Sequence, residues 1–252
     1  MDLNNRQLAI LDMLKVQNSI SISEFSSRLF FSASTIRRDL EVLESKNLVR
    51  RTHGGAVLVV DRNAEIPHSI RLADNSAAKS VIGKAAAGFV NNGDTIFLDS
   101  STTALYLLPS LMDKTDLTVI TNGLKTASAL SQYRNIRTIC TGGTLRENSL
   151  SFIGAHTRSC IDFYYVDKLF FSSRSISAKY GITDINEEEA LVRREMLMHC
   201  NTAFALADSS KFGTLSRCNV CSCQKADFII TEAPFKESDE WKPFSSKIIT
   251  AY

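Results

Sequence analysis

The sequence predicts an α/β protein with two unequal parts: a small helical part at the N-terminus and a larger part built on a mainly parallel sheet. Two observations predict this division. Over residues 3–45 apolar residues recur at helical spacing, whereas from residue 91 onward short apolar runs alternate with helical stretches. Strand–helix alternation of this kind implies βαβ units. We expect a first domain over residues 1–57, a linker over 58–75 and a second domain over 76–252.

The composition is that of an ordinary globular protein. Of the 252 residues, 44% are hydrophobic and 22% are charged, which suits one large domain or two unequal ones. No apolar run approaches the ~20 residues that a membrane span needs. The N-terminus also lacks the basic-then-apolar pattern of a secretion signal. We therefore expect a cytoplasmic protein with no membrane partner.

Cysteine usage points to a reducing compartment. Disulfides are not expected without a secretion signal. The stretch CNVCSC (218–223) contains a Cys-x-x-Cys pair, and zinc binding is the alternative to free thiols there, but no second pair follows it. We expect free thiols, no metal and no cofactor. The six cysteines are Cys140, Cys160, Cys200, Cys218, Cys221 and Cys223.

Three short helices are expected in the first domain. The first has apolar residues on one face, and the second is expected to be capped by Ser23. Ser32 is expected to cap a third helix that runs to about Ser45. The residues expected to face the core are Leu3, Ile10, Leu11, Leu14, Phe25, Leu29, Ile36, Leu40 and Leu43. Two apolar runs then flank His53-Gly54-Gly55, which predicts a β-hairpin with a glycine turn.

The positive charge of the chain is concentrated near the N-terminus. The formal net charge is +2, and residues 1–57 contain 8 Lys or Arg against 6 Asp or Glu, so the whole excess lies there. Arg37 and Arg38 fall in the first two turns of the third helix, where the backbone already presents positive charge. This placement is unfavourable unless an anion lies in front of the helix. The alternative is an ordinary solvated helix face.

Three helices followed by a hairpin are typical of a winged helix-turn-helix domain, whose second motif helix enters the DNA major groove by its N-terminal end. The anion is then the DNA backbone, and the predicted partner is double-stranded operator DNA. Arginine offers two donors to guanine, Ser and Thr contact base edges, and the wing reaches phosphates or the minor groove. The predicted DNA contacts are Ser32, Ser34, Thr35, Arg37, Arg38, Arg50, Arg51 and His53.

The second domain alternates between strands and helices. A helix is expected from about Lys79 to Val90. The expected strands are residues 94–99, 117–122, 136–143, 166–173, 202–208 and 227–231, and the further helices are 100–111, 123–133 and 187–200. In parallel sheets of this kind, ligands bind beyond the carboxyl ends of the strands.

Polar residues gather at those strand ends. Hydroxyls and backbone N–H groups at helix starts form anion sites, and Lys211 would add a positive charge. The alternative is that Ser, Thr and Gly are simply good caps and turn residues. Four such loops together favour a site for a phosphorylated small molecule. The residues concerned are Asp99, Ser100, Ser101, Thr102, Thr103, Asn122, Gly142, Gly143, Asp208 and Lys211.

The stretch STIRRDLEVLESKNLVRRTHGGAV (34–57) resembles the signature of the DeoR/GlpR family of bacterial transcriptional regulators. The rest of the chain is similar to the DeoR-type sensor domain, in which D-x-G-T-T, T-N, G-G and D-x-S-K-F-G recur. That domain shares the fold of ribose-phosphate isomerases and glucosamine-phosphate deaminases, and family members mostly sense sugar phosphates. The resemblance adds Arg193, which stands where lysine is frequent, to the expected effector residues.

The chain departs from the family pattern at several positions. Ser19 and Asn47 stand where glycine is common, and the stretch SSRS (172–175) replaces a glycine-rich one. Ser101 stands before the Thr pair where the family usually has glycine. A Cβ there is expected to narrow the site or to forbid a glycine backbone conformation, which would imply an atypical or weakly bound effector.

The sequence thus predicts a repressor of a carbohydrate-utilisation operon that a phosphorylated sugar releases, acting as a homo-oligomer, a dimer or tetramer. An activator is not distinguished from a repressor. The other alternative is a sugar-phosphate isomerase or deaminase with an added DNA-binding domain. Such an enzyme needs a carboxylate base beside its substrate. The stretch FFSSRS (170–175) has none, and Asp99 and Asp208 have no evident second group, so no catalytic residue is predicted.

Overall fold

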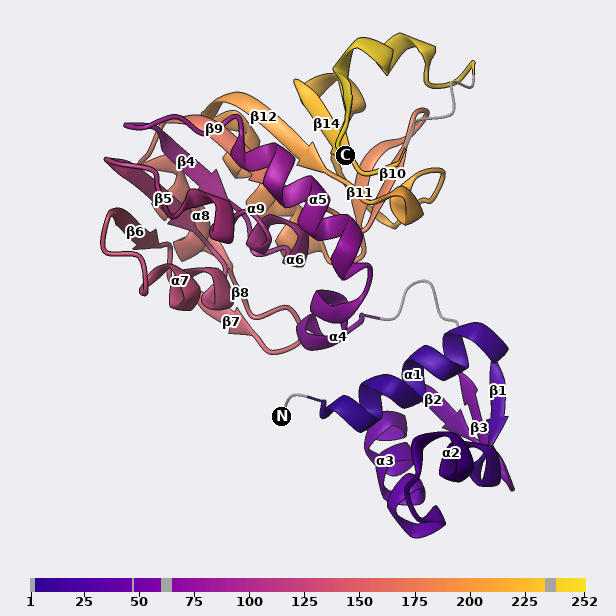
Figure 1. Cartoon of the computed structure of the whole chain (residues 1–252). Helices are drawn as coiled ribbons and strands as arrows, with labels where there is room; N and C mark the ends of the chain where they lie inside the picture. Colours follow the sequence, from indigo (N-terminus) through magenta and orange to yellow (C-terminus); the bar gives the residue numbers. More distant parts are fainter. Residues whose placement is uncertain (1–2, 47, 60–64, 234–238) are drawn as a thin grey trace. The chain divides into compact units, whose positions relative to one another are not determined.

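The computed structural model describes residues 3–46, 48–59, 65–233 and 239–252 (Figure 1). The chain divides into two compact units, Met1–Ile70 and Arg71–Tyr252. Asn47, one of the departures from the family pattern, lies outside the described residues.

The first unit is a winged helix-turn-helix, as predicted. Its order is α1 (Asn5–Gln17), β1 (Ser19–Ser21), α2 (Ile22–Leu29), α3 (Ala33–Ser45), β2 (Val49–Arg51) and β3 (Gly55–Leu58). The antiparallel sheet has the order β1-β3-β2, so the glycine hairpin is confirmed and a third strand, which the sequence pattern did not indicate, joins it.

Serine side chains cap both helices of the motif. Ser32 accepts a hydrogen bond from the Thr35 N–H and caps α3, as expected. The expected Ser23 cap of α2 is wrong, because Ser21 accepts the Glu24 N–H at 3.2 Å instead. Ser21 is the last residue of β1 and pairs with Gly55. Strand pairing therefore holds Ser21 extended, as a cap requires, and the helix starts two residues earlier.

The core of this unit follows the predicted periodicity. All but one of the expected core residues are buried, and Leu29 is partly buried against them. Six have no measurable exposure: Ile10, Leu14, Phe25, Ile36, Leu40 and Leu43. The predicted linker is not free of secondary structure, because α4 (His68–Ala73) falls within residues 58–75. The single Pro67 and the mixed polarity of this stretch concealed a helix of only six residues.

The second unit contains the predicted parallel sheet, with seven strands in the order β15-β14-β12-β9-β4-β5-β6 (Figure 1). Six of them coincide with the predicted strands: β4 (Thr95–Leu98), β5 (Leu117–Thr121), β6 (Ile136–Cys140), β9 (Val166–Phe171), β12 (Cys200–Leu206) and β14 (Phe228–Thr231). The edge strand β15 (Ile248–Thr250) was not expected.

Helices cover both faces of this sheet. They are α5 (Ser76–Ala87), α6 (Thr102–Leu105), α7 (Leu124–Leu130), α8 (Ala155–Asp162) and α9 (Glu187–Met198). Successive side chains of β4 point to opposite faces. Leu98 packs with Ile82 of α5, whereas Phe97 packs with Val192 of α9. Figure 1 shows α5 and α6 on one side of the sheet and α9 on the other.

The predicted helix over 100–111 is wrong in its extent. It divides into α6 and a 3₁₀ turn, η1 (Leu108–Leu111), because Pro109 has no backbone N–H to continue an α-helix. Two small sheets were also not expected: β7 (Thr144–Arg146) with β8 (Ser151–Ile153), and β10 (Ser175–Ser177), β11 (Gly181–Asp184) and β13 (Cys218–Cys221). The remaining 3₁₀ turns are η2 (Ser209–Lys211), η3 (Cys223–Lys225) and η4 (Lys242–Lys247).

All six cysteines are free thiols. In the described part of the chain, none of them joins a group of side chains that converge on a metal position. Burial raises the pKa of Cys221 to about 12, which is typical of an inert core thiol. Across the described residues, no helix has both the length and the apolar character needed to cross a membrane.

Candidate DNA-binding surface and effector site

The N-terminal end of α3 presents the predicted DNA-contacting side chains. Ser32, Ser34, Arg37 and Arg38 are exposed, and Thr35 is partly exposed. The opposite side of the helix is anchored by its apolar residues. Within the described residues, Arg37 and Arg38 form no ion pair, so both guanidinium groups keep their charge available for an anion.

The wing residues do not share one environment. Arg50 and His53 are exposed. Arg51 is also exposed, but it forms ion pairs with Glu41 at 2.9 Å and Glu44 at 2.7 Å, which tie the wing to α3. Hydrogen bonds from the backbone and side chain of Arg51 lower the pKa of Glu44. Arg51 is therefore already paired with carboxylates, which sequence reasoning did not foresee.

Asp39 is a structural residue of this surface that sequence reasoning missed. It is only 3% exposed, and it accepts hydrogen bonds from Arg6 and from Gln7 Nε2, at 3.0 Å for the latter. These hydrogen bonds join Arg6 and Gln7 of α1 to the middle of α3. This contact fixes the rotation of α3, so that Arg37 and Arg38 project outward. A charged residue within an apolar helical face was the only signal in the sequence.

The loop after β4 forms the frame of the candidate effector site. Asp99 is 1% exposed and accepts hydrogen bonds from the N–H of Ser101 at 3.0 Å and of Ser172 at 3.3 Å. The Ser101 hydroxyl also donates to Asp99 and accepts the Ala104 N–H. The loops after β4 and β9 are thus joined through one buried carboxylate.

The backbone at Ser101 is unstrained, so the expectation that a Cβ there forbids the local conformation is wrong. Its φ is −72° and its ψ is 148°, an ordinary extended conformation that any residue adopts. Its side chain caps α6. The serine therefore fits this backbone conformation and supplies the cap of α6.

Arg193 is placed at the site but is surrounded by carboxylates. Its side chain is 4% exposed and lies 2.8 Å from Asp99, 3.0 Å from Asp184 and 3.6 Å from Glu189. Burial disfavours the guanidinium charge, but the three carboxylates outweigh burial and raise the pKa of Arg193. The expectation that Asp99 has no second group beside it is therefore wrong, because Asp184 shares its arginine. These residues lie 85 positions apart in the chain, so spacing gave no signal.

Glu189 extends the same network. It pairs with Arg146 at 3.0 Å and accepts a hydrogen bond from Ser151 at 2.8 Å. Burial raises the pKa of Glu189, but the charge of Arg193 and hydrogen bonds from Ser149 and Ser151 outweigh it and lower the pKa to about 2. Glu189 is therefore ionised at any physiological pH. From the sequence, Glu189 was expected to lie on a charged helix, and no role at the site was predicted for it.

Lys211 lies where two of the predicted loops, those after β4 and β12, meet the loop after β9. Its ammonium group donates to Ser172 at 2.6 Å and to Thr103 at 3.4 Å, and it lies 3.9 Å from Asp208. Burial lowers the pKa of Lys211, and the neighbouring carboxylates oppose that effect only in part. Its side chain remains 18% exposed. Lys211 is therefore a desolvated cation with an open side, as an anion site requires.

Lys79 is a second cation at this site that sequence reasoning treated as an ordinary helix residue. It is 4% exposed, and it donates to the backbone carbonyls of Arg71 and Asp74, at 2.6 Å for the latter. Burial and the charge of Lys211 lower the pKa of Lys79 to about 8. Asn75, from the same segment, donates to Asp208 at 3.2 Å. The start of α5 therefore contributes to the site together with the loops after β4, β9 and β12.

Asn122 presents an unsatisfied acceptor. Its amide nitrogen donates to the Phe152 carbonyl at 3.1 Å, but its Oδ1 atom has no hydrogen-bond partner among the described residues, although the residue is 2% exposed. Buried orphan acceptors are rare in native proteins and point to an absent partner. The same amide nitrogen donates to the Ser100 hydroxyl at 3.5 Å. The loop after β5 thus offers one free acceptor, the Asn122 Oδ1 atom.

The glycines after β6 have different surroundings. A Cβ on Gly143 would lie 2.2 Å from the Thr157 hydroxyl, whereas a Cβ on Gly142 would meet nothing within 4 Å. The Thr157 hydroxyl donates to the Gly142 carbonyl at 2.7 Å. Gly143 is therefore required for the close approach of α8 to this loop.

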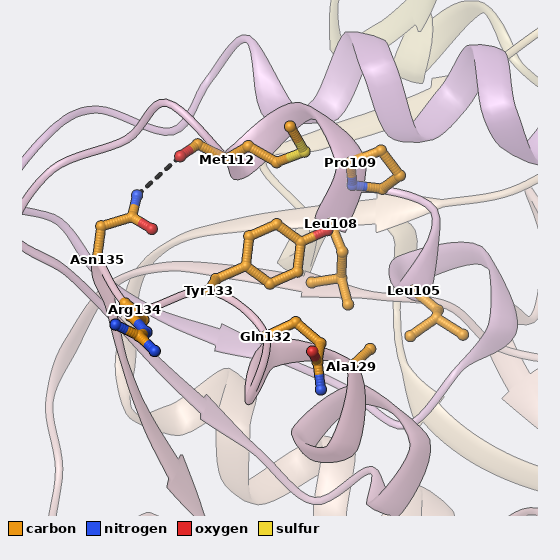
Figure 2. Close-up of a pocket in the computed structure, with 9 residues that line it drawn as sticks. All are labelled: Leu105, Leu108, Pro109, Met112, Ala129, Gln132, Tyr133, Arg134 and Asn135. Carbon is orange, nitrogen blue, oxygen red and sulfur yellow. Dashed lines mark hydrogen bonds between the residues drawn. The ribbon is translucent and has the colours of Figure 1, made fainter.

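An apolar pocket of about 770 Å³ lies elsewhere on the second unit, between η1 and α7 (Figure 2). Asn135 closes one side by donating to the Met112 carbonyl at 2.8 Å. No predicted effector residue lines it. The lining residues are Leu105, Leu108, Pro109, Met112, Ala129, Gln132, Tyr133, Arg134 and Asn135.

Comparison with known proteins identifies both units. Residues 6–62 match the model of the DeoR-like helix-turn-helix domain, and residues 74–233 match the DeoR C terminal sensor domain. The chain belongs to the DeoR family. All predicted DNA contacts of this DeoR-family protein lie in the first match, and all predicted effector residues lie in the second, as does Lys79.

Curated relatives of this DeoR-family protein are similar over nearly the whole chain. The uncharacterized regulator YulB of Bacillus subtilis is 40% identical over 90% of this chain and 88% of its own. GolR of Listeria innocua is 36% identical over 90% and 89%. The repressor GlcR of B. subtilis is 36% identical over 90% and 87%. This DeoR-family protein is therefore a DNA-binding transcriptional regulator.

The chain is also similar to ribose 5-phosphate isomerase A of Methanocaldococcus jannaschii. The likeness covers 55% of each chain, with a TM-score of 0.41 and 17% identity.

Proposed function

We propose that this protein represses a carbohydrate-utilisation operon and that a phosphorylated sugar releases it from the operator. The observation that carries the proposal is Lys211, a mostly buried cation that donates to Thr103 and Ser172 in the loops after β4 and β9. The charge of Lys211 acts on Lys79, and the loop after the neighbouring strand β5 presents the orphan acceptor of Asn122. The lysines suit a phosphate, and the acceptor suits a sugar hydroxyl. The relative GlcR is named a transcriptional repressor, which agrees with the proposal that this protein lowers transcription.

The effector proposal assigns different roles to the predicted residues. Lys211, Lys79, Thr102 and Thr103 would hold the phosphate, together with the N–H groups of the loop after β4. Asn122 and Ser100 would bind hydroxyls. Arg193 and Asp99 would hold the loops in place rather than contact the ligand, because their charges already face one another. Asp208 would position Lys211.

We propose further that the sensor unit binds its ligand without turning it over. The relatives named above are transcriptional regulators. Two buried carboxylates at this site, Asp99 and Asp184, both accept hydrogen bonds from the Arg193 guanidinium. A carboxylate held by a buried arginine is a poor general base. Turnover of a ketose or aldose phosphate clearly above background would contradict this proposal.

Footprinting tests the whole proposal. The full-length protein is applied to the DNA flanking its own gene, with and without a panel of sugar phosphates and the matching unphosphorylated sugars. We expect a protected, two-fold symmetric site that one phosphorylated sugar releases and its unphosphorylated form does not. In a transcription assay on the same template, the protein should lower transcript levels, and a rise would identify an activator. Protection that no phosphorylated compound changes would contradict the effector proposal.

We also propose that the protein acts in the cytoplasm as a homo-oligomer. A two-fold symmetric dimer places two recognition helices on successive half-sites and multiplies their affinity. Light scattering with and without operator DNA measures the assembly. A protein that stays a monomer on its operator would contradict this part of the proposal.

A further inference from the structure

Phe30, at the turn between α2 and α3, combines two unfavourable features. Its φ is 58° and its ψ is 37°, a left-handed conformation that bulky residues rarely adopt. Its side chain is also fully presented to solvent, with 90% of the residue exposed. A glycine, or a small polar residue, would satisfy this turn without either cost. The ring therefore calls for an explanation outside the folding of this unit.

The turn itself is rigid, and Phe30 takes no part in holding it. The Ser26 hydroxyl donates to the Phe31 carbonyl at 2.6 Å. The Arg6 guanidinium lies 4.6 Å from the centre of the Phe31 ring. The next residue, Ser32, caps α3. These contacts fix the backbone on the C-terminal side of Phe30 while its own ring projects away from the domain.

The position of the ring indicates what it meets. Phe30 precedes the α3 cap by two residues and lies at the helix end that carries Ser34, Thr35, Arg37 and Arg38. An apolar group beside this polar and cationic surface fits DNA better than it fits a protein face. In the major groove, the C5-methyl of thymine is the apolar group on the base edges, and phenylalanine is suited to contact it.

We propose that Phe30 is an apolar DNA contact that packs against a thymine methyl group at the edge of each operator half-site and so adds a preference for thymine there. The proposal rests on the DNA-binding function argued above and on the exposure and position of the ring. The left-handed turn holds the ring outward before DNA arrives, so that little side-chain freedom is lost on binding.

The test removes the Phe30 ring and the thymine methyl group separately. Full-length wild type and Phe30→Gly are titrated with the footprinted operator and with operators in which each thymine in turn is replaced by deoxyuridine, which lacks the methyl group. Uncovering one methyl group costs about fourfold in affinity. Phe30→Gly removes this contact from both half-sites of the operator, so we expect it to bind about 16-fold more weakly. At one position per half-site, a single deoxyuridine should weaken wild type about fourfold and leave the affinity of Phe30→Gly unchanged.

Two controls separate this contact from a structural effect. The urea midpoint of Phe30→Gly should be no lower than that of wild type, because glycine accepts a φ of 58°. Val16→Ala removes another exposed apolar group, one on α1 that is 89% exposed, and should bind the operator like wild type.

The outcomes that overturn the inference are distinct. Equal operator affinity of Phe30→Gly and wild type would overturn it. So would an affinity loss that couples to no thymine position, or a change in oligomeric mass at unchanged affinity, which would make the ring a protein contact. Arg38→Ala, measured in parallel, keeps the two claims apart: if Arg38→Ala loses affinity and Phe30→Gly does not, only the thymine contact fails.

Discussion

Arg38 projects from α3 on the side opposite the apolar core, and within the described chain no carboxylate engages it. We therefore expect Arg38→Ala to lower operator affinity by about 1–3 kcal/mol, the usual cost of losing a specific base contact. Stability should change little, because the side chain supports no packing. Val42→Ala, on the same helix, is the matched control and should bind normally. A mobility-shift titration measures both variants, and unchanged binding by Arg38→Ala would remove it from the contact surface.

Lys79 makes effector binding depend on pH. Its pKa is lowered to about 8 by burial and by the charge of Lys211, so it is charged below that pH and neutral above it. If the cation holds a phosphate, affinity for the responding sugar phosphate should fall as the pH rises from 7 to 9. Lys211 acts in the same direction, since its pKa is also lowered. Isothermal titration calorimetry across this range measures the effect. Lys79→Gln should bind more weakly at pH 7 and vary less with pH, whereas a pH-independent wild type would contradict this role.

At the scale of elements, the wing contains two adjacent arginines with different surroundings. Both are exposed, but Arg51 forms ion pairs with Glu41 and Glu44. We expect Arg50→Ala to weaken binding to all DNA sequences alike and to reduce the salt dependence of log affinity by about 1, the slope change for one lost phosphate contact. Arg51→Ala should change that slope less, because two carboxylates compete with the phosphate. Affinities measured over a range of salt concentrations test this, and equal slope changes would show that Arg51 leaves its carboxylates on DNA.

The loop between β6 and β7 depends on two glycines with different requirements. Gly143 has a φ of 115°, and a Cβ there would lie 2.2 Å from Thr157. Gly143→Ala should therefore cost about 2 kcal/mol or more, since it adds both backbone strain and overpacking. Gly142→Ala is the matched control, because its φ of 63° is disfavoured for alanine but its Cβ would meet nothing within 4 Å. It should cost about 1 kcal/mol. Urea denaturation compares the two, and equal costs would show that α8 yields to the new side chain.

At the scale of the whole molecule, the sequence predicted the parts whose pattern is local. Helical spacing placed Ile36, Leu40 and Leu43 in the core, and strand–helix alternation predicted the parallel sheet. The polar network of the effector site was mostly missed, because its members meet only after folding. Asp184 and Glu189 approach Asp99 through Arg193, although no spacing in the chain links them. A buried lysine such as Lys79 has the same sequence signature as a solvated one, so its place at the site is evident only from its burial in the structure.

Substitution of Lys211 tests whether effector binding in the second unit is coupled to operator binding by the first unit. A ligand shifts the DNA-binding equilibrium only through its different affinity for the bound and free states of the protein. Lys211→Ala removes a charge-assisted contact to the proposed phosphate and leaves the helix-turn-helix untouched, so the expected variant binds its operator normally and no longer responds to effector.

Operator release is titrated against effector for wild type and Lys211→Ala, with thermal unfolding of both proteins measured without ligand. Thr103→Val tests the same phosphate position without a change of charge and should shift the release curve toward higher effector concentration. Identical release curves for wild type and Lys211→Ala would show that Lys211 does not hold the ligand. Loss of DNA binding in the absence of ligand would show instead that the contacts of Lys211 with Ser172, Thr103 and Asp208 serve the fold or the assembly.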